Sequence, residues 1–219
     1  MKIFTFKEIF PLFFIMWAVI IGVAVFMAPC IPDQLPTHWN AQGQIDGYSS
    51  KPVAVFLLMG VLLAMYVLML VLPRLDPFRK NYEHFEKQYY VLRLALTIFF
   101  VALYIFTLLA AAGYEVDIRN FMIPGFSLLF IVIGFMIPKM KRNYFVGIKT
   151  PWTLQSEEVW NKTHKMAGKC FIAAGILCFF TLWVGNWAFG IFMAIILLAA
   201  LAPVVYSYLL YRKLGLFKK

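Results

Sequence analysis

Long apolar stretches separated by short polar segments dominate this sequence. A helix that crosses a hydrocarbon core of ~30 Å needs about 20 mostly apolar residues. Six stretches approach or meet that length, and the fourth and fifth are the shortest. They cover approximately residues 9–28, 53–72, 91–112, 121–137, 170–184 and 187–208. The pattern therefore predicts an all-α polytopic membrane protein with six transmembrane helices.

Two of these stretches need a separate argument. Only Gly185 and Asn186 part the fifth from the sixth, so one long helix with a kink is an alternative to two helices. An apolar run of roughly 40 residues exceeds the thickness of a bilayer, which favours two. The first stretch follows Lys2 and Lys7 as a signal peptide would, but its apolar run is long and no small-x-small cleavage site follows. We expect a retained helix.

The composition supports a lipid environment. Hydrophobic residues make up 63% of the 219 residues and charged residues only 14%, whereas soluble domains average roughly 25% charged residues. A soluble fold would expose large apolar patches. The net charge of +10 would fit a nucleic-acid-binding protein, but in a membrane protein Lys and Arg collect on the cytoplasmic side. We therefore expect the lipid bilayer as a partner and no direct nucleic acid binding.

The positions of the basic residues predict the orientation. With the N-terminus inside, all Lys and Arg residues except Lys51 and Arg119 fall in segments on the inner side. This asymmetry follows the positive-inside rule, and an odd number of helices would have destroyed it. The prediction is a multi-pass protein of the bacterial plasma membrane with both termini in the cytoplasm.

The predicted spans lack the groups that most enzymes and coupled carriers need. No ionisable residue lies near the middle of a span, although coupled carriers generally hold one there. The weakly polar residues Thr97, Thr107, Ser127, Thr181 and Ser207 fit helix-to-helix hydrogen bonds, and Gly60 and Ala64 fit close helix packing. The three cysteines show no CxxC spacing. We expect no catalytic residue, no metal and no cofactor.

The predicted outer segment, residues 31–52, has more specific chemistry than a connector needs. Asp46-Gly47 is a strong turn dipeptide, and we expect positive φ angles at Gly43 and Gly47. Asn40 and Asp46 can bond to nearby backbone amides. A binding role and a loop that merely lies on the bilayer both remain open. The candidates for a toxin- or ligand-binding site are His38, Trp39, Asn40, Gly43, Asp46, Gly47 and Tyr48.

The predicted inner segment, residues 139–169, is the second candidate. Thr150 followed by Pro151 fits an N-cap and first residue of a helical turn, and Ser156 fits the N-cap of a second helix. On that helix Trp160 and His164 share a face, which either lies on the bilayer or docks under the bundle. The candidates for partner binding are Arg142, Asn143, Gly147, Lys149, Thr150, Pro151, Trp152, Glu157, Trp160 and His164.

Both segments resemble known family signatures. Residues 36–51 match the pattern P-x-H-W-N-x-x-G-x-x-D-G-Y-x-x-K of a widespread bacterial membrane domain of unknown function. Residues 142–153 match R-N-x-x-x-G-I-[RK]-T-P-W-T, which is typical of the SdpI/YfhL family, with Lys149 where Arg is common. Both patterns in this order, in a chain of this length, are similar to the arrangement of that family.

The resemblance implies a non-enzymatic immunity or sensor protein. The family's namesake protects a bacterium from its own secreted antimicrobial peptide and is credited with holding a cytoplasmic repressor at the membrane. A peptide toxin outside and a repressor protein inside are therefore the expected partners. The alternative is a carrier or exporter built on an inverted repeat of three plus three helices, with halves at residues 1–112 and 113–219, because each motif segment follows the first helix of its half.

Overall fold

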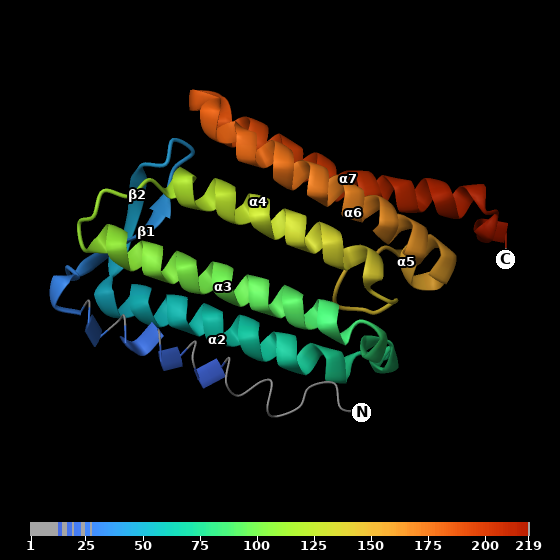
Figure 1. Ribbon diagram of the computed structural model, residues 1–219, viewed down its shortest axis with the longest axis horizontal. Coiled ribbons are helices and arrows are strands. Elements are labelled where there is room, and N and C mark those ends of the chain that lie inside the picture. Colours follow the sequence, from blue (N-terminus) through green and yellow to red (C-terminus); the bar gives the residue numbers. More distant parts are fainter. Residues whose placement is uncertain (1–12, 15–16, 19, 23–24, 27, 219) are drawn as a thin grey trace. The chain divides into compact units, whose positions relative to one another are not determined.

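The computed structural model describes residues 13–14, 17–18, 20–22, 25–26 and 28–218, and it is mainly helical (Figure 1). Within these described residues, five helices are long and apolar enough to cross a membrane. They comprise Lys51–Leu75, Glu86–Ala111, Ile118–Lys139, Glu157–Trp183 and Gly185–Lys213. Half of the predicted first span, residues 9–28, falls outside the described residues. The structure thus confirms the all-α polytopic class, while the count of six stays a prediction.

Long helices carry these spans: α2 (Lys51–Leu75), α3 (Glu86–Ala111), α4 (Ile118–Met136), α6 (Glu157–Phe180) and α7 (Ala188–Lys213). Their surfaces expose large apolar side chains, among them Phe56 at 72% and Leu198 at 69%. Contiguous apolar surface of this kind would be unfavourable in water and is what a helix presents to lipid.

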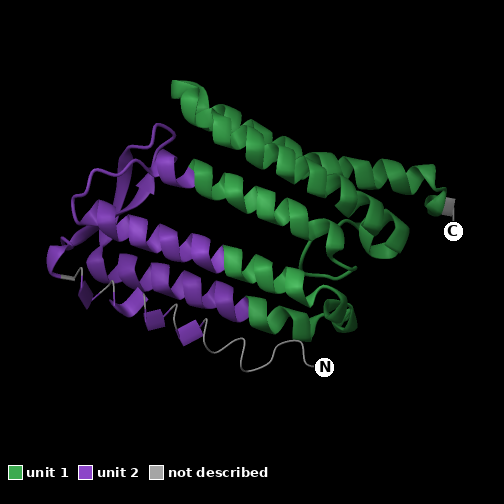
Figure 2. Ribbon diagram, viewed as in Figure 1, with its two compact units in different colours: residues 1, 69–95, 123–219 green, residues 2–68, 96–122 purple. Residues whose placement is uncertain are grey.

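The chain divides into two compact units (Figure 2). Unit 1 contains residues 69–95 and 123–219, and unit 2 contains residues 2–68 and 96–122. Helices α2, α3 and α4 are each divided between the two units, with one part in unit 1 and the other in unit 2. The sequential halves 1–112 and 113–219 stay a prediction.

Among the described residues, the departure from an all-α fold lies in unit 2. Strands β1 (Gln34–Trp39) and β2 (Ile45–Ser50) form an antiparallel hairpin, with an irregular register where His38 pairs with Gly47. The outer segment is therefore a β-hairpin and not an irregular loop. Its residues alternate in exposure along β2, as expected for a strand with one covered face.

Unit 1 contains the inner segment and most of the close helix packing. Helix α5 (Pro151–Gln155) begins at the N-cap Thr150, and α6 begins at the N-cap Ser156. Both predicted caps are confirmed. The helix predicted after Ser156 and the fifth span were expected as separate elements. They form one helix instead, because α6 runs without a break from Glu157 to Phe180.

Helix α3 begins at Glu86, so Arg93 lies in its second turn, where it is fully buried. One further prediction needs correction. No described residue lies within 4 Å of a Cβ built on Gly60, so the predicted close helix contact is not found among the described residues. Close packing occurs at other glycines: a Cβ on Gly168 would approach the Gly134 carbonyl oxygen to 2.7 Å, and one on Gly175 would approach the Ser127 carbonyl oxygen to 2.5 Å. These glycines let α4 and α6 pack backbone to backbone.

The fifth and sixth spans are two helices, as predicted. A turn between α6 and α7 contains Gly185 at φ 64°. The two helices pack against each other in unit 1, with Cys178, Ala188 and Phe192 in a shared apolar cluster. Residues 37–42 and 150–155 both read T-x-W-x-x-Q. The two segments have different structures, since the first lies in a strand and turn and the second starts a helix.

Candidate functional site

The turn of the hairpin in unit 2 is built by Asn40. Its side-chain Oδ1 accepts hydrogen bonds from the amides of Gln42 and Gln44, both at 3.0 Å. The Asn40 amide donates to the Gln44 carbonyl oxygen at 2.8 Å, and Gly43 adopts φ 82°. The predicted local bonding of Asn40 and positive φ of Gly43 are confirmed. The turn is therefore held by its own residues.

The positive φ predicted for Gly47 is wrong. The turn lies at residues 40–44, so Asp46 and Gly47 belong to β2 instead. Gly47 is needed for a different reason: a Cβ there would lie 2.8 Å from the Cβ of His38 on the facing strand. Asp46 does not bond to a backbone amide as predicted but to His38, with Nδ1 and Oδ1 2.5 Å apart.

The hairpin has one covered and one exposed side. Trp39 packs near Phe106 of α3, with ring centroids 6.2 Å apart, and Phe106 stacks on Phe121 of α4 at 5.0 Å. This aromatic series anchors β1 within unit 2. His38 and Asp46 remain largely accessible, with side-chain exposures of 72% and 42%, and Tyr48 is 58% exposed. These three residues form a surface that a molecule from outside the protein can reach.

The start of α4 supports the same turn. A Cβ on Gly43 would lie 3.1 Å from Arg119 and 3.2 Å from Asp117. Asp117 accepts from the Arg119 amide at 2.8 Å and from its guanidinium at 2.9 Å. The hydrogen bond and charge of Arg119 hold the pKa of the Asp117 carboxyl below its usual range, although partial burial opposes this. Sequence reasoning missed Asp117 as a contributor to the outer site.

In unit 1 the inner segment is organised around two buried polar side chains. Asn143 is fully buried, and its Oδ1 accepts from the amides of Phe145 at 3.0 Å and Val146 at 2.7 Å. Its Nδ2 donates to the Lys141 carbonyl oxygen at 2.9 Å. Asn143 thereby fixes the backbone of the motif.

The second buried group is Asp76, which sequence reasoning missed. Its carboxylate accepts from the amides of Phe78 at 2.7 Å and Tyr144 at 2.8 Å, and from the Tyr82 hydroxyl at 3.0 Å. The same hydroxyl lies 3.3 Å from Oδ1 of Asn143. Burial and then the Asp76 carboxylate raise the pKa of Tyr82, so the phenol keeps the proton that it donates.

This arrangement joins the connection between α2 and α3 to the motif. Asn81 adds a hydrogen bond from its Nδ2 to the Arg142 carbonyl oxygen at 2.7 Å. The dipeptide Asp76-Pro77 at the end of an apolar helix signals a turn. This local signal does not reveal that Asp76 accepts a hydrogen bond from Tyr144, 68 residues further along the chain.

Trp160 and His164 of α6 dock under the motif and do not face lipid. The Trp160 Nε1 donates to the Met140 carbonyl oxygen at 2.9 Å, and its ring stacks on His164 with centroids 3.9 Å apart. His164 Nε2 accepts from the Ile148 amide at 3.1 Å, so Nδ1 is the donor to the Trp160 carbonyl oxygen at 2.8 Å. Gly147 has φ 116°, and a Cβ there would collide with the His164 ring.

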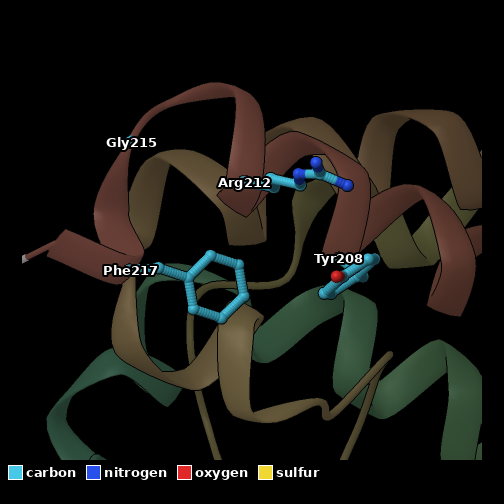
Figure 3. Close-up of a pocket in the computed structure, with 4 residues that line it drawn as sticks. All are labelled: Tyr208, Arg212, Gly215 and Phe217. Atoms are coloured by element: carbon cyan, nitrogen blue, oxygen red, sulfur yellow. The ribbon is translucent and has the colours of Figure 1, made fainter.

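Helix α5 connects the motif to α7. The hydroxyls of Thr150 and Ser207 lie 3.1 Å apart, and Trp152 packs against Tyr208 with ring centroids 5.1 Å apart. Beside this contact lies a pocket of about 430 Å³ (Figure 3). It is lined by Tyr208, Arg212, Gly215 and Phe217.

The inner candidates therefore separate into two groups. Asn143, Thr150, Trp160 and His164 are buried and make the fold of the motif. Lys149, Pro151 and Glu157 are exposed, and Arg142, Gly147 and Trp152 are intermediate. Only the exposed and intermediate residues can contact another molecule. No group of three or more His, Cys, Asp and Glu side chains arranged to hold a metal ion occurs among the described residues.

Comparison with known proteins matches both segments to families. Residues 139–207 match the SdpI/YfhL protein family. The C-terminal part of this chain is therefore similar to that family. Residues 14–73, which include the hairpin, match a domain of unknown function, DUF1648.

One relative is similar along most of the chain. The chain is 28% identical over 199 residues to the immunity protein SdpI of Bacillus subtilis (strain 168). The matched residues cover 88% of this chain and 90% of that protein. No solved structure matches the chain. The SdpI/YfhL region, the relative and the apolar helices together identify a multi-pass membrane protein.

Proposed function

We propose that this chain is a membrane immunity protein that protects its cell from a secreted antimicrobial peptide. The observation that carries the proposal is the similarity to the immunity protein SdpI along 88% of the chain. The hairpin adds physical support, since a folded surface with accessible His38, Asp46 and Tyr48 is suited to binding a ligand. No catalytic step is part of the proposal.

The hairpin is the proposed site for the peptide toxin. Its shape depends on local bonds of Asn40 and on the small residues Gly43 and Gly47, while Trp39 anchors it to α3. His38, Asp46 and Tyr48 would make the contacts. A charged and aromatic surface of this kind can bind an amphipathic peptide without a deep pocket.

The inner segment is the proposed site for a cytoplasmic partner such as a repressor protein. Lys149, Glu157 and the partly exposed Trp152 lie on or beside the motif. Trp152 packs against Tyr208, which lines the pocket around Arg212 (Figure 3). The buried residues would hold this surface in one conformation. Binding at the inner segment would then depend on the exposed side chains and only indirectly on Asn143 or His164.

A survival assay tests the immunity function. The measurement is growth of a strain lacking its own SdpI-type protein, with and without this chain, in the presence of the cognate secreted peptide. We expect growth only with the chain. Equal killing in both strains, with the chain present in the membrane, would refute the proposal.

Matched variants distinguish the immunity protein from a carrier. Asp46→Asn should reduce survival and spare a reporter for the inner partner, whereas Lys149→Gln and Glu157→Gln should impair the reporter and spare survival. A carrier with one transport cycle predicts the same defect for both sets. Membrane levels of each variant are the control.

The proposed orientation puts both termini in the cytoplasm. Cys30 is exposed, whereas Cys170 lies inside α6 and Cys178 is buried. A membrane-impermeant thiol reagent should label Cys30 in intact cells. Glu158→Cys in a Cys30→Ser background should be labelled only after the cells are opened, and labelling from outside would reverse the orientation.

A further inference from the structure

A second pocket lies in unit 1 where α2 ends. It has a volume of about 450 Å³ and is formed by one continuous segment, residues 74–81. Three basic side chains line it: Arg74, Arg79 and Lys80. Neither the hairpin nor the motif surface includes these residues, so the proposed function does not use them.

The pocket carries a positive charge that the described residues do not neutralise. No ion pair joins Arg79 or Lys80 to a carboxylate within the part of the chain that the structure describes. Arg74 donates to the Leu70 carbonyl oxygen of its own helix at 3.0 Å. The acidic residue in the wall, Asp76, is 1% exposed, and its carboxylate already accepts three hydrogen bonds.

Contacts with residues outside the pocket fix the position of its wall. Asp76 accepts from the Phe78 amide, and the Phe78 ring stacks on Tyr144 with centroids 5.3 Å apart and planes at 10°. The Arg142 guanidinium lies 4.7 Å from the centroid of the Phe78 ring. These contacts order the backbone that carries Arg79 and Lys80, which lowers the entropic cost of binding an anion there.

The position of the pocket indicates the source of the anion. Arg74 is in the last turn of α2, a 25-residue helix that is apolar enough to cross a membrane, and Arg79 and Lys80 follow within six residues. Residues directly after such a helix lie at the level of the lipid headgroups. Basic pockets at that level bind anionic headgroups.

We propose that this pocket binds the phosphate of an anionic phospholipid headgroup. Arg79 and Lys80 supply the principal charges, and Arg74 approaches from the helix. The pocket around Arg212 is lined by a single cation and two aromatic rings, and it is the weaker site for such a group.

Native mass spectrometry of the purified full-length protein in detergent tests the proposal. Phosphatidylglycerol and phosphatidylcholine of equal chain length are added in equal amounts, and the bound fraction of each is measured. The test variant is Arg79→Gln/Lys80→Gln. The matched control, Lys87→Gln/Lys165→Gln, removes the same charge from two exposed lysines outside the pocket.

We expect the unaltered protein to retain phosphatidylglycerol preferentially. The pocket variant should lose affinity for it by about 25-fold, from roughly fivefold for each basic residue, and the control should not. Arg79→Lys/Lys80→Arg, which keeps both charges, should retain binding and also guards against a folding defect. Equal losses in the pocket variant and the control would overturn the proposal, because the attraction would then be diffuse.

A soluble competitor separates a lipid from free phosphate. Glycerol 3-phosphate has the same phosphate chemistry without acyl chains, and we expect it to leave phosphatidylglycerol bound. Displacement of the lipid at equal concentration would show a site for soluble phosphate esters and overturn the lipid assignment. Equal retention of phosphatidylcholine and phosphatidylglycerol would also overturn it.

Discussion

The hairpin of unit 2 and the inner motif of unit 1 use the same residue type in opposite ways. Asn40 and Asn143 each accept hydrogen bonds from two nearby backbone amides through Oδ1. Asn40 does so in a turn open to solvent, whereas Asn143 is fully buried and also contacts Tyr82 from another segment. The hairpin is therefore a self-contained surface, and the motif is part of a packed core.

This difference changes how the candidate residues should be interpreted. Exposed side chains on the hairpin, such as His38 and Asp46, are available for recognition. At the inner motif the polar residues with the most specific bonding are buried, so their replacement damages the fold before it affects any partner. Variants at the two segments therefore need separate measurements of stability.

The largest effect is expected for Asn143→Ala. The change leaves the buried amides of Phe145 and Val146 without their acceptor, which costs roughly 3 kcal/mol of unfolding free energy. The measurement is thermal unfolding of the purified protein in detergent. Asn40→Ala is the matched control and should cost under about 1 kcal/mol, since water can replace its bonds. Similar losses at both positions would remove the distinction between the two regions.

Helix packing gives the next effect. At Gly168 a Cβ would approach the Gly134 carbonyl oxygen to 2.7 Å, and we expect Gly168→Ala to destabilise unit 1 by roughly 1–3 kcal/mol. Gly60→Ala makes the same change in a helix where a Cβ meets no described residue within 4 Å. It should keep or raise the melting temperature, because Ala favours a helix over Gly. A melting temperature unchanged by Gly168→Ala would show that α4 and α6 can separate without cost.

In the hairpin, the predicted effect is smaller and local. Gly47→Val places a side chain against His38, where even a Cβ would be at 2.8 Å, so it should disrupt the pairing of β1 with β2 by about 1–2 kcal/mol. Hydrogen exchange by mass spectrometry should show faster exchange across residues 34–50 and none of this change in α6. Ser49→Ala is the control on the same strand. Equal exchange in both variants would mean that the facing strands tolerate the added bulk.

The sequence predicted the helices better than the site. Apolar stretches and caps such as Thr150 and Ser156 are local signals, and the structure confirms both caps. The strands were missed because Gly43, Asp46 and Gly47 indicated turns throughout, although only Gly43 lies in one. Asp76 was missed for a different reason: its role depends on Tyr82 and Tyr144, and contacts between distant segments leave no periodic pattern in a sequence.

The smallest effect concerns acid, at the start of α4 beside the hairpin turn. Arg119 lowers the pKa of the Asp117 carboxyl in the folded protein, so the folded state binds a proton less readily than the unfolded state. The stabilisation is present above the ordinary carboxyl pKa of about 3.9 and is lost as the pH falls through the lower folded value. Because the Arg119 and Asp117 side chains are 40% and 33% exposed, screening limits this stabilisation to under about 1 kcal/mol.

Asp117→Asn keeps an oxygen that can accept from the Arg119 amide but removes the charge. It should therefore abolish the extra acid sensitivity of hydrogen exchange in residues 40–44 below about pH 4. Glu115 is an exposed carboxylate two residues away, and Glu115→Gln should leave that acid sensitivity unchanged. An unchanged acid response in Asp117→Asn would show that the ion pair does not support the hairpin turn.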